Sequence, residues 1–184
     1  QKLSIAGQLI IGSAKNEDPK RAGLLKTPER FGKAVEFLLS GYEDTPESIV
    51  GEGVFPSESR GVVSVNKVEF YSLCEHHMLP FSGFAHIAYI PIDNIVGISK
   101  LARLVEKHAK QLQNQERITK NIAFDLVQYL KPLGAAVIIE ASHGCMKCRG
   151  IKKQNSIMTT SAMKGVFFDK PEARTELMQL ISLN

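Results

Sequence analysis

The sequence predicts an α+β protein in which helices precede a small antiparallel sheet. Apolar residues recur at helical spacing over the first forty residues, whereas segments rich in β-branched and aromatic residues begin after residue 60. Two further helical patterns separate the second of these segments from the third. Because short strands that follow one another through short turns favour antiparallel pairing, we expect this class rather than a doubly wound parallel sheet.

An N-terminal helical arm and its connecting loop are expected over residues 1–60. Apolar residues from Leu3 to Ala14 predict a first helix. The segment Thr27-Pro28-Glu29-Arg30 is typical of a helix start, with the threonine as N-cap, the proline at the first helical position and an acid in the first turn. This second helix is expected to end at Gly41, before a loop rich in Pro, Gly and Ser.

A second domain, expected over residues 61–184, contains four predicted strands and three helices. The strands are expected at Val62–Leu73, Phe84–Pro91, Ala135–Ala141 and within Ser156–Phe168. Ser99 is a plausible N-cap for the first of two amphipathic helices between the second and third strands, and Asp169 for the final helix. Because four strands leave exposed edges, pairing with another subunit is one expected solution.

Composition and charge exclude several classes of protein. With 43% hydrophobic and 23% charged residues, the chain is neither disordered, collagen-like nor a coiled-coil rod. The longest apolar run, around Ala135–Ile139, has the length of a strand, so no membrane span is expected. A net charge of +4 is too weak to indicate nucleic acid as a partner, and three cysteines are too few for a disulfide framework. We therefore expect a soluble cytoplasmic protein.

Two short segments carry most of the residues suited to metal chemistry. Cys74-Glu75-His76-His77 ends the first predicted strand, and the segment His143–Gly150 follows the third. Together they hold all three cysteines and three of the five histidines, which are the residue types that Zn²⁺ prefers. The spacing Cys74-x-x-His77 lets two ligands from one turn reach one ion. We therefore expect a zinc site shared by the two segments.

Two ligand sets are compatible with this spacing. Adding both Cys145 and Cys148 to the first pair gives a closed site with a structural role. Adding Cys145 alone leaves the fourth position open for water, with His76 and His143 nearby as proton-transfer groups. A chain of 184 residues needs no zinc to stabilise its core, and the closed site gives the two spare histidines no role.

The remaining candidates are weaker. His86, within a predicted strand, and His108, on a predicted helix, are expected to pack in the interior or lie at the surface. The stretch from His143 to Lys153 has four basic residues and no acid. Such a cluster is either a solvated loop or a site for an anionic ligand.

Four segments taken together resemble the GTP cyclohydrolase I family. They are Ser72–Pro80, Gly97–Arg103, Gln113–Thr119 and His143–Gly150, and Thr27-Pro28-Glu29-Arg30 matches as well. The resemblance implies the tunnelling fold, a four-stranded antiparallel sheet with two helices between strands 2 and 3, for a catalytic domain over residues 61–184. It also implies a ring-shaped homo-decamer whose sheets join edge to edge and whose active sites lie where subunits meet.

The resemblance also implies a reaction and its machinery. The enzyme would convert GTP and water to formate and 7,8-dihydroneopterin triphosphate, the first step of a pterin (folate or biopterin) pathway. The implied Zn²⁺ ligands are Cys74, His77 and Cys145. The implied catalytic residues are His76, which would protonate N7 of the base, His143, which would manage protons as the ribose opens, and Ser99, which would assist the carbohydrate rearrangement.

The implied substrate-binding residues divide between the base and the triphosphate. The carboxylate of Glu116 can accept from N1–H and the exocyclic NH₂ of guanine together, with Gln115 in support. Cations suit the triphosphate, and guanidinium groups can bind it bidentately. The matching positions are Arg149, Lys100 and Arg103, with Arg30 and Lys33 contributed from a neighbouring subunit.

Two alternatives to this function stay open at the level of sequence. The first is another enzyme of the same fold that acts on a different purine-like or pterin substrate. The second is a zinc-stabilised binding module without enzymatic activity, for example one that binds RNA through its basic loop, although the aromatic residues expected for base stacking are missing there. Zinc analysis combined with GTP turnover would separate these possibilities.

Overall fold

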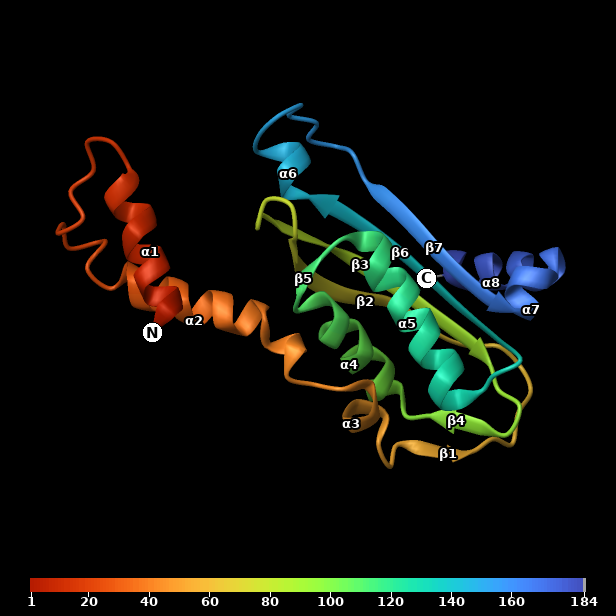
Figure 1. Cartoon of the computed structure of the whole chain (residues 1–184). Helices are drawn as coiled ribbons and strands as arrows, with labels where there is room; N and C mark the ends of the chain where they lie inside the picture. The colour runs from red at the N-terminus through yellow and green to blue at the C-terminus, as the bar shows by residue number, and fades with distance from the viewer. Residues whose placement is uncertain (184) are drawn as a thin grey trace. The chain divides into compact units, whose positions relative to one another are not determined.

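The computed structural model describes residues 1–183 and confirms the α+β class (Figure 1). The contacts between residues divide the chain into two units, one over residues 1–40 and one from residue 41 onward. A catalytic role for residues 61–184 stays a prediction. Within residues 1–183, no helix is both long enough and apolar enough to cross a membrane.

The first unit is a pair of helices, α1 (Lys2–Ser13) and α2 (Thr27–Leu38). Gly7 and Gly32 are buried where the two helices meet. A Cβ atom at Gly32 would lie 2.8 Å from Ser4 Oγ, so the absence of a side chain lets the helices approach closely.

The bounds of α2 differ from the sequence prediction at both ends. The N-cap is Lys26 rather than Thr27, and the Thr27 hydroxyl instead donates to the Gly23 carbonyl at 3.2 Å. This is possible because a turn precedes the helix, and in this turn the Thr27 backbone N–H donates to the Leu24 carbonyl. The helix ends at Leu38, and Gly41 lies beyond it in the 3₁₀ turn η1 (Ser40–Tyr42).

The second unit contains a five-stranded sheet with the order β5-β2-β3-β6-β7. Four long strands pair antiparallel, and a two-residue strand, β5, pairs parallel to β2. A separate two-stranded antiparallel sheet joins β1 to β4. The bounds are β1 (Val54–Pro56), β2 (Val63–Cys74), β3 (Pro80–Ile90), β4 (Asn94–Val96), β5 (Leu112–Gln113), β6 (Gly134–His143) and β7 (Met158–Gly165).

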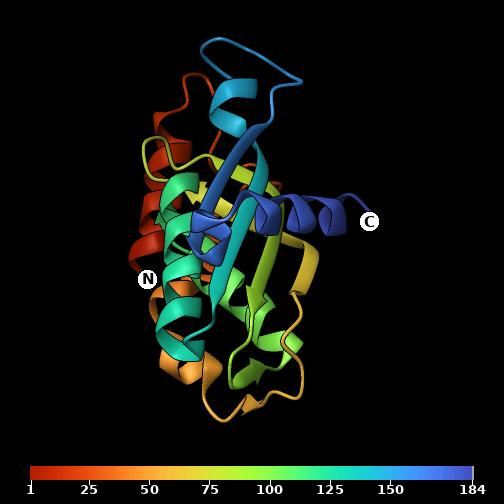
Figure 2. The same ribbon diagram turned by 90° about the vertical axis from the view of Figure 1, so that its right-hand side faces the viewer.

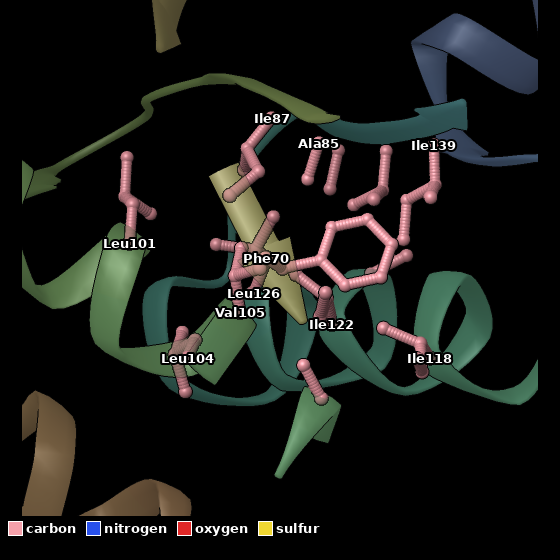
Figure 3. Close-up of a cluster of buried hydrophobic side chains, with 14 of the residues drawn as sticks. Phe70, Ala85, Ile87, Leu101, Leu104, Val105, Ile118, Ile122, Leu126 and Ile139 are labelled. Carbon is pink, nitrogen blue, oxygen red and sulfur yellow. The ribbon is translucent and has the colours of Figure 1, made fainter. Parts of the chain in front are cut away.

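Two helices cover one face of the main sheet and form the core with it. They are α4 (Ile98–Ala109) and α5 (Gln115–Leu130), which lie between β3 and β6 in the chain. Full burial of one aliphatic side chain stabilises the fold by about 1.5–3 kcal/mol, so this shared layer supplies much of the driving force for folding. The core residues include Phe70, Ala85, Ile87 and Ile139 from the strands and Leu101, Leu104, Val105, Ile118, Ile122 and Leu126 from the helices (Figure 3).

Shorter helices complete the second unit. They are α3 (Pro46–Val50), α6 (Gly144–Lys147) and α7 (Val166–Asp169), followed by the longer α8 (Pro171–Ser182). Phe167 of α7 and Leu177 of α8 pack with Ala88 and Ala136, whose neighbours along the strands face α4 and α5. The C-terminal helix therefore belongs to the opposite face of the sheet, and Figure 2 shows it in blue at the C-terminus.

Two predicted helix caps are wrong for reasons that the neighbouring residues supply. The N-cap of α4 is Gly97, whose N–H donates to the Gly53 carbonyl at 2.9 Å, so that the helix begins directly after β4 and Ser99 lies inside its first turn. The N-cap of α8 is Lys170, because Asp169 is the last residue of α7 and Pro171 begins the next helix.

Candidate metal centre and active site

Cys74, His77 and Cys145 form a compact group of potential metal ligands. Their ligand atoms all lie within 4.8 Å of one another, and Cys74 Sγ lies 3.9 Å from His77 Nδ1. Two thiolates and one imidazole are a donor set that Zn²⁺ accepts readily. The structure therefore brings together the three-ligand set that leaves a fourth position open.

The turn after β2 places two of these ligands side by side. The backbone N–H groups of His77 and Met78 both donate to the Cys74 carbonyl, at 3.3 and 2.7 Å. Met78 adopts a left-handed conformation with φ of 52°, and the Cys74 N–H donates to the Leu79 carbonyl at 2.9 Å. This tight turn folds His77 back toward Cys74 before β3 begins.

The third ligand arrives from β6, on the other side of β3. His143 ends β6 opposite Phe81 at the start of β3, and α6 begins with Gly144. A Cβ atom at Gly144 would lie 2.7 Å from the Pro80 carbonyl oxygen, so only glycine allows this close passage. The following residue, Cys145, thereby lies next to the turn that carries Cys74.

The proximity of the Cys74 and Cys145 side chains suits a cation between them. Burial is the main cause that raises the pKa of the Cys145 thiol, and the adjacent Cys74 raises it further. Two neighbouring thiolates repel each other, whereas a divalent cation bound by both would offset that repulsion. The residues present therefore fit a bound metal ion.

Cys148 is not in this group. It is exposed, and its thiol donates to the Gly144 carbonyl at 3.0 Å from the C-terminal end of α6. In the part of the chain that the structure describes, the ligand group contains three residues. The arrangement is therefore not the closed set of four ligands that the spacing alone also allowed.

His76 lies beside the ligand group. Its Nδ1 is 3.9 Å from Cys74 Sγ, and its Nε2 is 3.8 Å from Glu75 Oε1. The ring is exposed and is not one of the three mutually close ligands. An exposed imidazole at this place can exchange a proton with a molecule bound next to the metal ligands.

His143 is fixed by two contacts. Its ring stacks on Phe81 with centroids 4.4 Å apart and planes inclined by 7°, and its Nε2 lies 2.9 Å from Gln115 Oε1. Burial lowers the pKa of the His143 imidazole, and the Glu116 carboxylate opposes this effect. The Gln115 side chain is itself fully buried, whereas Glu116 is exposed in the first turn of α5.

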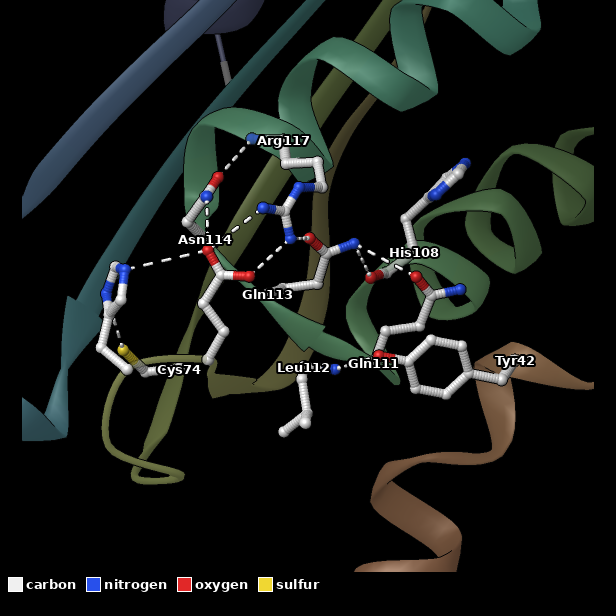
Figure 4. Close-up of polar contacts among 10 residues, drawn as sticks. Tyr42, Cys74, His108, Gln111, Leu112, Gln113, Asn114 and Arg117 are labelled. Atoms are coloured by element: carbon white, nitrogen blue, oxygen red, sulfur yellow. Dashed lines mark hydrogen bonds and ion pairs between the residues drawn. The ribbon is translucent and has the colours of Figure 1, made fainter.

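An ion pair that the sequence analysis missed joins the ligand turn to α5. Arg117 binds the Glu75 carboxylate bidentately, with Nη1–Oε2 and Nη2–Oε1 distances of 2.6 and 3.1 Å (Figure 4). Asn114, whose Oδ1 caps α5, donates from Nδ2 to Glu75 Oε1 at 2.9 Å. Arg117 is the main cause that holds the pKa of Glu75 below its usual value. The two residues are 42 positions apart in the chain, so no local pattern in the sequence indicates the pair.

Three predicted site residues do not meet the ligand group within one chain. Ser99, Lys100 and Arg103 lie in the first half of α4, whose first residue, Ile98, lines the same hollow as Val65 near the start of β2. Cys74 is the last residue of β2 and lies nine residues after Val65, so roughly 30 Å of extended strand separate the start of α4 from the ligand group. One chain therefore presents two separate groups of candidate residues.

The other predicted positions have simple surroundings. Arg149 is exposed and follows Cys148, the C-cap of α6. Arg30 and Lys33 are exposed on α2 in the first unit, where Lys33 pairs with Glu29 at 2.7 Å. Their place in a substrate site stays a prediction.

The two remaining histidines are interior residues. His86 is buried in β3, and burial lowers the pKa of its imidazole. His108 is buried between α4 and α5, where its Nε2 lies 2.6 Å from Asp125 Oδ2. Neither belongs to the ligand group.

A hollow of about 350 Å³ lies on the sheet and contains none of the predicted site residues. It is lined by side chains that include Glu69, Tyr71, Phe84 and Glu140. This hollow is therefore separate from the ligand group.

Comparison with known proteins agrees with the motifs. A family model described as GTP cyclohydrolase I matches residues 8–182. The protein named GTP cyclohydrolase 1 from Chlorobium chlorochromatii is 51% identical over 90% of this chain and 74% of its own length. Its namesakes from Deinococcus radiodurans and Campylobacter concisus are 50% and 47% identical, over 92% and 94% of this chain and 78% and 89% of their own lengths.

Proposed function

The chain belongs to the GTP cyclohydrolase I family, and we propose that Cys74, His77 and Cys145 hold the Zn²⁺ ion with which it converts GTP. The enzyme acts on GTP and water to give 7,8-dihydroneopterin triphosphate and formate. The observation that carries the metal proposal is the convergence of three ligand atoms within 4.8 Å where β2 and β6 end on either side of β3. Zn²⁺ held there would act as a Lewis acid, lowering the pKa of water to roughly 7 so that a nucleophile is available at neutral pH.

We assign the proton transfers to the two histidines beside the ligands. His76 is exposed and close to Cys74, so it can donate a proton to N7 of the guanine ring, which makes C8 more electrophilic. His143 is half-buried and held in one orientation, which suits a group that must exchange protons with the ribose as it opens. Neither histidine belongs to the group of three metal ligands, so both imidazoles are available for proton transfer.

Glu116 is suited to selecting the base. It is exposed in the first turn of α5, one residue before the arginine that is tied to the ligand turn. An ionised carboxylate accepts two hydrogen bonds, and N1–H and the 2-amino group of guanine donate two in parallel. Adenine does not offer this pair, so the enzyme should prefer GTP to ATP.

A second copy of the chain would complete the site. Ser99, Lys100 and Arg103 lie far from the metal ligands of their own chain, and the sheet ends in unpaired edges at β5 and β7. We propose that the chain forms the tunnelling fold and assembles edge to edge into a homo-oligomer. The family resemblance implies that this oligomer is a decamer. In it, one subunit supplies the ligand group and a neighbour supplies the start of α4 for the triphosphate and the ribose.

The test combines metal content with product analysis in matched cysteine variants. Cys145→Ser should lose zinc and GTP turnover together, because thiolate supplies much of the affinity for zinc. Cys148→Ser, three residues away, should retain both. Zinc loss in the Cys148 variant would establish a closed structural site and contradict the proposed function of the ligand group.

A further inference from the structure

The buried amide of Gln115 has a role that its place in the motif does not reveal. Its side chain has no exposed surface, and its Nε2 lies 2.9 Å from the carbonyl oxygens of both Ile139 and Met158. Its Oε1 lies 2.9 Å from His143 Nε2. The amide therefore bridges the backbone of β6 and β7 and the imidazole of a catalytic histidine.

The surroundings leave the amide one orientation. Carbonyl oxygens only accept hydrogen bonds, so the NH₂ group must face Ile139 and Met158, and its two hydrogens are then both used. A nearby hydroxyl agrees with this assignment. Thr119 Oγ1 donates to the Gln115 carbonyl at 2.8 Å, so it accepts from Thr160 Oγ1 at 2.7 Å. With its own hydrogen used in this way, Thr160 Oγ1 presents only an acceptor to the amide Nε2, 3.1 Å away, and shares the two amide hydrogens with the carbonyls.

This orientation determines where His143 carries its proton. Because Oε1 is an acceptor, the imidazole must donate from Nε2. A neutral imidazole with a hydrogen on Nε2 has a free lone pair on Nδ1. The stacked Phe81 ring fixes the plane in which that lone pair lies.

We infer that Gln115 is a positioning residue that fixes the Nε2–H tautomer of His143 and so presents Nδ1 as the proton acceptor for the substrate. The inference rests on the proposed function. It replaces direct support of guanine as the role of Gln115, because a buried amide whose groups are all bonded inside the chain has none left for a base. Recognition of the base is then left to the exposed Glu116.

Gln115→Met tests the inference, because methionine fills a similar volume without the amide. We expect kcat to fall about 10²-fold, within the range for a misplaced acid–base group, with zinc content and KM nearly unchanged. The loss should be equal for GTP and ITP, which lacks the 2-amino group. Gln128→Met makes the same chemical change at an exposed position of α5 and should leave all these values unchanged.

A larger loss with GTP than with ITP, or a raised KM at normal kcat, would show that Gln115 contacts guanine and would overturn the inference. Nitrogen-15 NMR of histidine-labelled, zinc-loaded enzyme gives an independent readout, with a His143→Gln sample for assignment. His143 should show a protonated Nε2 and an unprotonated Nδ1 in the wild type and a mixture in Gln115→Met. The opposite tautomer in the wild type would refute the assignment whether or not the variant folds. Failure of the wild type to convert GTP would instead count against the proposed function.

Discussion

Removing the Arg117 guanidinium should weaken zinc binding, although Arg117 touches no ligand. The substitution Arg117→Met deletes both hydrogen bonds to Glu75, which lies between Cys74 and His77 in the turn that carries two ligands. Other contacts of the turn remain, including the bond from the Glu75 N–H to the Gln113 carbonyl at 2.9 Å. We therefore expect a looser turn and not an unfolded one.

The magnitude follows from the exposure and geometry of the pair. The side chains of Arg117 and Glu75 are 45% and 26% exposed, so solvent screens their attraction. Exposed pairs contribute about 0.2–1 kcal/mol, and the bidentate geometry with a third bond from Asn114 places this pair near the upper end. If all of about 1 kcal/mol acts on the ligand turn, the zinc dissociation constant rises about fivefold, since about 1.4 kcal/mol corresponds to tenfold.

Competition with a chromophoric chelator at low salt measures this dissociation constant. Glu75→Gln should give a similar rise, and the double variant should show about fivefold rather than about 25-fold, because both substitutions remove one interaction. Lys120→Met, which removes an exposed cation from the same helix, is the control and should leave zinc affinity unchanged. Additive losses in the double variant, or a wild-type affinity in both single variants, would refute the proposed coupling.

Three further predictions concern the reaction and the core. Alanine at His76 or His143 should lower kcat by about 10²–10⁴-fold with zinc retained; zinc loss by metal analysis in either variant would mean that the ligand set is wrong. Glu116→Gln places a hydrogen-bond donor where guanine needs an acceptor, so GTP turnover should fall at least about tenfold without a change in zinc content. Normal kinetics with GTP would show that another residue recognises guanine. Asp125→Ala leaves the buried His108 Nε2 without its hydrogen-bond partner and should cost about 1–3 kcal/mol of unfolding free energy, measured by denaturant titration. Replacing both His108 and Asp125 with leucine should lower the free energy of unfolding by less than Asp125→Ala does. An equal loss would contradict the claim that the unpartnered His108 causes the cost.

The elements that the sequence predicted well are those with a long repeating signal. The apolar faces of α4 and α5 follow from helical spacing, and the four long strands follow from runs of β-branched and aromatic residues. The two residues of β5 are too few to produce any period, so that strand depends on the tertiary contact of Leu112 and Gln113 with β2. The caps at Thr27, Ser99 and Asp169 were mistaken because a suitable side chain is common, whereas the actual start depends on the preceding turn.

The site shows the same division between local and distant information. The three ligands could be nominated because their types and spacing are chemically distinctive within two short segments. The Glu75–Arg117 pair joins residues that are 42 positions apart, and no local pattern indicates it. Likewise, adjacent residues at the start of α5 differ completely in burial, since Gln115 points into the sheet while Glu116 faces solvent. Only the packed structure separates their roles.

The most direct test of the central claim is to measure zinc per chain and the products from GTP in one preparation of the wild-type protein. We predict one zinc per chain, release of formate, and a pterin triphosphate that becomes fluorescent on oxidation, with all three lost together in Cys145→Ser. Formate and pterin production at full rate by enzyme stripped of zinc, or a zinc-replete protein that leaves GTP intact, would contradict the account.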